Sequence, residues 1–147
     1  MLSGGRGTAD DVNGFWLSHH PPDQGMRAYD FGGIHVCARC LGTYPMLFAV
    51  LLAQLRHRTA SAWQHDIAFA CLLTLPALVD WAVGQRWPRW GPKGLRTLSG
   101  MGLGVALGRT LYVHLIHPLP QALLAQAALV TAVAGPVMIW NFWRRPR

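Results

Sequence analysis

Residues 121–143 contain no charged side chain, and three arginines, Arg144, Arg145 and Arg147, follow close behind them. A transmembrane helix needs about 20 predominantly apolar residues, so this run is long enough to cross a bilayer. Three further apolar stretches precede it, at residues 41–55, 67–83 and 98–116. The sequence therefore predicts an all-α membrane protein with four transmembrane helices.

The composition agrees with this prediction. Of the 147 residues, 52% are apolar and 13% are charged, and there is no glutamate. Globular domains usually have about 25% charged residues, so these values exclude a disordered chain, a secreted disulfide scaffold and an ordinary soluble enzyme. We expect one membrane domain over residues 15–143, between a flexible tail at 1–14 and a basic tail at 144–147.

Basic residues are divided unevenly between the two sides that four spans would define. The side with both termini and the second loop would hold most of the 13 Lys and Arg residues, whereas the other side would hold Arg56 and Arg58. Positive loops stay cytoplasmic, so we expect an inner-membrane protein with both termini in the cytoplasm. The net charge of +7 then favours contact with the lipid bilayer and its anionic headgroups over nucleic acid.

The densest group of reactive side chains lies just before the first apolar stretch. Two cysteines there form a CxxC pair, and three histidines precede them. Zinc takes four tetrahedral ligands from Cys and neutral His, and a cytoplasmic surface keeps thiols reduced. We therefore predict an N-terminal cytoplasmic Cys/His loop that binds zinc, with the candidate ligands Cys37, Cys40, His19, His20 and His35.

The CxxC pair also has two other interpretations, as a redox dithiol or as interfacial cysteines without special chemistry. Gly42, two residues after Cys40, favours the metal interpretation because glycine permits backbone N–H groups to point at sulfur. The third cysteine, Cys71, stands alone in an apolar stretch.

Two ionisable residues fall inside the predicted spans, Asp80 in the second and Arg109 in the third. Each costs roughly 2.5 to 3.5 kcal/mol at the centre of a span, so a partner is expected. In the simplest arrangement Asp80 and Arg109 pair and hold two helices together. Alternatively, Arg39, Arg86 and Arg96 surround Asp80 and form an electropositive pocket for a phosphate or another anion.

The third stretch contains two overlapping GxxxG motifs, formed by Gly100, Gly104 and Gly108. Small residues at this spacing let one helix face approach a neighbour closely. This face is the candidate surface for a membrane-protein partner or for self-association.

Several of these motifs occur together in a known family. His19-His20-Pro21, the VCARCLGTY string at 36–44, the Pro-x-x-x-Asp that ends at Asp80 and the LRTLSG string at 95–100 resemble an uncharacterised family of small predicted membrane proteins of bacteria and archaea. The resemblance covers residues 15–110, and CxRCxG-[TI]-Y is its specific part. Family members often have a cysteine where this chain has Ser18, so a zinc site here would need histidine or water in that place. The resemblance implies where the function lies but supplies no reaction.

Three functions remain open, and whether the chain is an enzyme is undecided. The first is a zinc site at the cytoplasmic surface, either structural or catalytic toward an anionic lipid-type substrate, with Asp80, Arg39, Arg96 and Arg109 as candidate catalytic residues. The second is a membrane thiol oxidoreductase. The chain lacks the second cysteine pair that such an enzyme needs to pass electrons on, which argues against this function. The third is a non-catalytic accessory subunit of a membrane complex.

Overall fold

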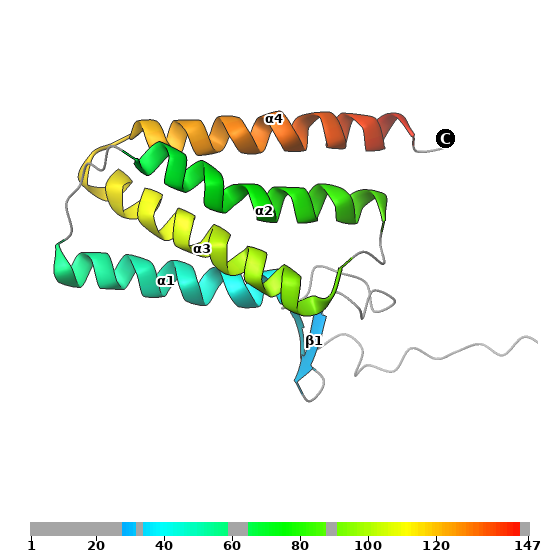
Figure 1. Cartoon of the computed structure of the whole chain (residues 1–147), viewed down its shortest axis with the longest axis horizontal. Coiled ribbons are helices and arrows are strands. Elements are labelled where there is room, and N and C mark those ends of the chain that lie inside the picture. The colour runs from blue at the N-terminus through cyan, green and yellow to red at the C-terminus, as the bar shows by residue number, and fades with distance from the viewer. Residues whose placement is uncertain (1–27, 32–33, 59–64, 88–90, 145–147) are drawn as a thin grey trace, which may run out of the picture.

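The computed structural model describes residues 28–31, 34–58, 65–87 and 91–144. These residues form two strands, β1 (Ala28–Phe31) and β2 (Ile34–Cys37), and then four helices, α1 (Ala38–His57), α2 (Asp66–Arg86), α3 (Lys93–Ile116) and α4 (Gln121–Trp143) (Figure 1). Successive helices run in opposite directions. As a result, α1 and α3 begin, and α2 and α4 end, at the end of the bundle where the strands lie. We call this the hairpin end and the other the opposite end.

The two strands pair as an antiparallel hairpin at a point where a loop is expected from the sequence. Their register places Phe31 opposite Ile34 and Tyr29 opposite Val36. Aromatic and β-branched residues favour strands, and the two residues between the strands in the sequence are both glycine, which two-residue hairpin connections favour. The fold is therefore helical with a small β-hairpin that leads directly into α1.

The structure supports three of the four predicted spans. Among the described residues, α1, α2 and α4 are long and apolar enough to cross a membrane. The third predicted span is also a helix, α3, but it does not reach the same hydropathy because Arg109, His114 and several glycines interrupt its apolar residues. The bounds of α4 agree with the prediction, and the other three helices extend a few residues beyond the predicted stretches.

The helices are arranged so that α3 is covered on two sides. It packs between α1 and α2, and α4 packs on the far side of α2 (Figure 1). Most of the buried polar side chains of the bundle therefore belong to α3 or face it. Those on α3 itself are Arg96, Ser99, Arg109 and Thr110.

The glycine face of α3 is in contact with α1 of the same chain. A Cβ atom added at any of the three glycines would lie closer than 3.0 Å to a carbonyl oxygen of α1, and these oxygens follow one another at intervals of one turn, at Arg39, Thr43 and Leu47. Gly100, Gly104 and Gly108 are all buried. The close neighbour expected from the GxxxG motifs is thus α1, and this face is not available to a partner protein or a second copy.

Candidate functional site

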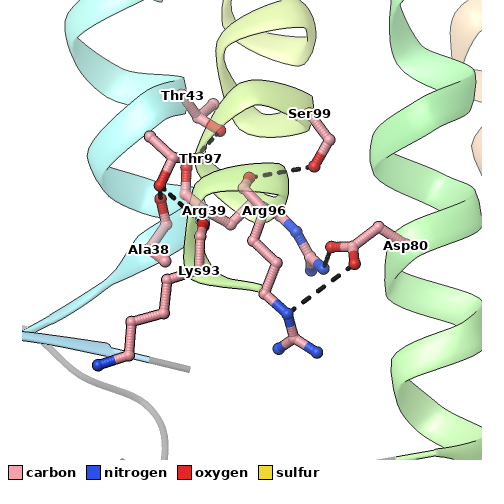
Figure 2. A network of polar contacts seen from close by, with 8 residues as sticks. All are labelled: Ala38, Arg39, Thr43, Asp80, Lys93, Arg96, Thr97 and Ser99. Atoms are coloured by element: carbon pink, nitrogen blue, oxygen red, sulfur yellow. Dashed lines mark hydrogen bonds and ion pairs between the residues drawn. The ribbon is translucent and has the colours of Figure 1, made fainter. Parts of the chain in front are cut away.

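Asp80 of α2 faces two arginines at the hairpin end of the bundle (Figure 2). The Nη2 atom of Arg39, in the first turn of α1, donates a hydrogen bond to Asp80 Oδ2. The Nε atom of Arg96, near the start of α3, lies 3.9 Å from Asp80 Oδ1, which is too long for a hydrogen bond. The Asp80 and Arg96 side chains are each 6% exposed and that of Arg39 is 25% exposed. Two guanidinium groups and one carboxylate give this cluster an excess of one positive charge.

Two threonine hydroxyls hold the backbones of α1 and α3 together beside this cluster (Figure 2). Thr43 Oγ1 lies 2.9 Å from the carbonyl oxygen of Arg39 and 3.1 Å from that of Gly100. Thr97 Oγ1 lies 3.1 Å from the carbonyl oxygen of Ala38. Together with the close glycine contacts, these bonds fix the positions from which the two arginines reach Asp80.

Gly91, between α2 and α3, lies next to the gap between Asp80 and Arg96. Gly91 has a φ of +79°, a conformation that L side chains rarely adopt. A Cβ atom added at Gly91 would lie 3.8 Å from Asp80 Oδ1 and 4.0 Å from Arg96 Nε. No side chain at this position fills the approach to the two charged atoms. The cluster thus lies directly beside Gly91, at the hairpin end of the bundle.

The cluster leaves buried polar atoms without hydrogen bonds. Asp80 Oδ1 and Arg39 Nε are both buried, and no described residue forms a hydrogen bond with either atom. Buried polar atoms in folded proteins nearly always have a partner, and an exception is a place where water, an ion or a function has to be considered. These two atoms make the cluster the strongest candidate site among the described residues.

Arg109 is bound at the other end of the molecule, to Asp66 and not to Asp80 as expected. Its Nε and Nη2 atoms each donate a 3.0 Å hydrogen bond to Asp66, and Nη1 donates one of 3.1 Å to Gln54. Asp66 and Asp80 are 14 positions apart on α2, which is about 21 Å along a helix. Because α3 runs antiparallel to α2, Arg109 near its end meets the start of α2, and Arg96 near its start meets Asp80. Asp66 escapes notice in the sequence because it precedes the apolar stretch.

A third polar contact joins three helices between these two clusters. Gln126 of α4 donates from Nε2 to Thr74 Oγ1 of α2 at 2.7 Å and accepts from Thr110 Oγ1 of α3 at 3.0 Å. All three residues are almost fully buried. Uncharged polar residues inside apolar stretches are a weak sequence signal for such a contact. The one available signal is that Thr74 lies on the same face of α2 as Asp66 and Asp80.

The third arginine expected near Asp80, Arg86, lies elsewhere. It lines a groove between α2 and α4 together with Trp140. The expected pocket of three arginines is therefore a pair, Arg39 and Arg96.

The two cysteines of the CxxC pair are next to each other at the junction of β2 and α1. Cys37 is the last residue of β2 and is buried, Cys40 is in the first turn of α1, and both are free thiols whose side chains lie near each other. Within the described residues no group of three or more possible metal ligands occurs. His19 and His20 lie outside the described residues, and of His35 only the backbone, in β2, is described.

Gly42 has a different role from the one expected. A Cβ atom at this position would collide with the carbonyl oxygen of Thr97 on α3. The glycine therefore serves helix packing, and the structure gives no indication that it turns backbone N–H groups toward the cysteines.

The family described as "Predicted membrane protein (DUF2085)" matches residues 27–110, which is more than half of the chain. The matched part begins just before β1 and ends in α3, so it includes the Asp80 cluster, the CxxC pair and the contact between Arg109 and Asp66. None of the curated proteins and none of the solved structures with which the chain was compared matches it.

Proposed function

The chain belongs to this DUF2085 family of membrane proteins, and we propose that it binds an anionic, phosphate-type group at the hairpin end, between Arg39 and Arg96. The single observation that carries this proposal is that two arginines converge on one carboxylate, while the Nε donor of one of them, Arg39, is buried without an acceptor. Guanidinium groups bind carboxylate and phosphate oxygens through paired N–H donors. An anion that bridges the two arginines would balance the excess charge and give Arg39 Nε the acceptor that it lacks. Asp80 Oδ1 needs a donor instead, such as water or the hydroxyl of a protonated phosphate.

The ends of two helices add to the positive potential at this place. Both α1 and α3 begin at the hairpin end, and neither has a side-chain cap or an acidic residue in its first turn. The N-terminus of a helix has the equivalent of about half a positive charge and unpaired N–H groups. Arg39 and Arg96 lie in the first turns of these helices, so cations are placed where the helix dipoles disfavour them. An anion is the group that would relieve this repulsion.

The position of the cluster suits a headgroup at the membrane surface. Asp80 precedes the last residue of α2, Arg86, by six positions, or about 9 Å along the helix. When α2 spans the bilayer with Arg86 at headgroup level, Asp80 lies about 9 Å below that level, so the site lies just below the headgroup region, within reach of a phosphate drawn toward the arginines. In this proposal α3 also crosses the membrane, and its polar residues are shielded from lipid by α1 and α2. The hairpin end faces the cytoplasm, since the basic residues of the described helices concentrate there.

Within this site Arg39 and Arg96 bind the anion and Asp80 positions them. If the bound group is a substrate, Asp80 is the residue placed to accept or donate a proton. Arg109 has no part in the site, because it follows Arg96 on α3 by 13 positions, or about 20 Å.

The test uses the full chain in detergent, titrated at constant ionic strength with inorganic phosphate or glycerol phosphate while the unfolding midpoint is measured. A ligand that binds the folded chain stabilises it by about 2.7 kcal/mol at 100 times its Kd. We expect the midpoint to rise with ligand in the wild type and in the control Arg56→Gln, an exposed residue at the opposite end. The rise should be lost in Arg96→Gln and in Arg39→Gln. A stronger effect of glycerol phosphate indicates a lipid headgroup, an equal effect indicates phosphate itself, and no rise in the wild type overturns the proposal.

A second candidate function is metal binding by the CxxC pair, and the observation that favours it is the adjacency of two free thiols. Cys37 and Cys40 would supply two sulfur ligands for zinc, and the histidines at 19, 20 and 35 are the candidates for the others. Such a site would fix the N-terminal segment on the bundle or, with one position open to water, act on the bound anion.

Elemental analysis of the purified protein tests this second candidate. We expect about one zinc per chain in the wild type and in the control Cys71→Ala, and none in Cys37→Ala/Cys40→Ala. Absence of zinc from the wild type, with two freely titrating thiols, contradicts it. A reversible disulfide between the two cysteines would instead support the thiol oxidoreductase interpretation.

A further inference from the structure

A groove lies between the second half of α2 and the second half of α4, on the side of α2 that faces away from the Asp80 cluster. Asp80 and Gly84 belong to the buried face of α2. The groove lies on a different side of α2, next to α4 (Figure 1). Its volume is about 330 Å³, near the lower limit for small-molecule sites. The lining residues are Ala82, Gln85 and Arg86 from α2, and Pro136, Val137, Trp140 and Asn141 from α4.

The groove exists because α4 is packed tightly only near its start. The buried residues of α4 are Ala122 and Gln126, both in its first half. Further along, a Cβ atom added at Gly135 would touch nothing within 4 Å. The side chains around Pro136 thus leave a space beside α2 that no described residue fills.

The groove combines an apolar floor with a cationic rim. Alanine, proline, valine and tryptophan side chains form the floor, and Gln85, Arg86 and Asn141 are its polar members. The guanidinium of Arg144 lies 4.3 Å from the centre of the Trp140 ring, as in a cation–π contact. No acidic residue lines the groove. Charge complementarity therefore selects an amphiphile with an anionic head.

We propose that this groove binds an anionic phospholipid, with the upper part of one acyl chain along Ala82, Val137 and Trp140 and the phosphate at Arg86 and Arg144. Both arginines follow the last apolar turn of a helix that is long and apolar enough to span the membrane, so they lie at headgroup level. Basic pockets between transmembrane helices at this level bind anionic headgroups. The site shares no residue with the anion site at Asp80, and either site can exist without the other.

Native mass spectrometry of the delipidated full chain tests the proposal, with phosphatidylglycerol and phosphatidylcholine of identical acyl chains as probes. We expect the wild type to prefer phosphatidylglycerol, and Arg86→Gln to lower that preference about fivefold, the effect of one surface cation. Ala82→Phe, which fills the floor, should lower the binding of both lipids. Arg56→Gln, which removes an exposed arginine at the opposite end, is the matched control.

The proposal is overturned if Arg86→Gln binds both lipids as the wild type does, or if Arg56→Gln lowers the preference equally, since that would indicate general surface charge. Arg86 is exposed, so its substitution should leave the unfolding midpoint unchanged. Loss of phosphate binding in Arg96→Gln with an unchanged lipid preference would separate this site from the one at Asp80.

Discussion

The guanidinium of Arg109 and the carboxylate of Asp66 form a bidentate pair, with Nε–Oδ1 and Nη2–Oδ2 distances of 3.0 Å each. Both side chains are more than nine-tenths buried. A further bond from Arg109 to Gln54 makes this one side chain the junction of α1, α2 and α3. All three guanidinium nitrogens of Arg109 and both carboxylate oxygens of Asp66 form hydrogen bonds within the bundle. The cluster at Asp80, in contrast, leaves two buried atoms without hydrogen bonds. This contrast separates a structural contact from a candidate binding site.

Replacement of Arg109 by methionine should destabilise the protein by about 3–5 kcal/mol, because it leaves the Asp66 carboxylate buried without its partner. The double variant Arg109→Met/Asp66→Leu should recover most of that loss, since a well-packed apolar pair avoids the desolvation of both charges. The free energy of unfolding in detergent measures both effects. A double variant as unstable as the single one would contradict this account.

Gly104→Val should destabilise the bundle by more than about 2 kcal/mol, because the added Cβ would collide with the carbonyl oxygen of Thr43 on α1. Gly135→Ala is the control, since a Cβ there meets nothing within 4 Å. It should be neutral or should stabilise α4 by about 0.5–1 kcal/mol through helix propensity. Thermal unfolding followed by circular dichroism gives both values, and equal losses in the two variants would contradict the packing.

Gln126→Leu should cost less, about 0.6–1.7 kcal/mol, which is the range of measured hydrogen bonds between membrane helices. The hydroxyl of Thr110 keeps an alternative acceptor in the carbonyl oxygen of Ala106, 3.0 Å away. Thr131→Val is the control, because the Thr131 hydroxyl donates within α4, to the carbonyl oxygen of Ala127, on an exposed face. A loss as large as that of Arg109→Met would show that the polar contact in the middle of the bundle contributes more than the structure indicates.

The number and approximate extent of the helices could be predicted from the sequence, because apolar runs bounded by arginines determine them. The glycines at 100, 104 and 108 indicated a close helix neighbour but not its identity, since spacing alone does not distinguish α1 from another chain. The prediction that Arg109 pairs with Asp80 was wrong for a related reason. Asp80 was the acidic residue inside an apolar run, and only the antiparallel register of α2 and α3 brings Asp66 to Arg109. Arg39 and Arg96 were correctly expected near Asp80, whereas the zinc ligand set stays a prediction.

Asp80→Asn should raise the affinity for phosphate, because it increases the net charge of the cluster from one positive to two. Without an anion the same variant should be less stable than the wild type, since Arg39 and Arg96 lose their counter-ion. The prediction rests on the proposed anion site, and unfolding midpoints with and without phosphate test it. If phosphate raises the midpoint of the variant no more than that of the wild type, Asp80 does not compete with the anion.

Labelling of intact cells with a membrane-impermeant maleimide tests the orientation. Both cysteines of the CxxC pair lie at the hairpin end, which we place in the cytoplasm, and Arg58 lies at the opposite end, just after α1. With Cys71, which lies near the start of α2 at the opposite end, replaced by alanine, the chain should therefore stay unlabelled. The same chain with Arg58→Cys should be labelled, because its new thiol faces outward. Permeabilised cells provide the control, since Cys40 is only partly buried and should then react unless a metal holds it. Labelling of the Cys71→Ala chain in intact cells would reverse the orientation, and with it the cytoplasmic position of the anion site.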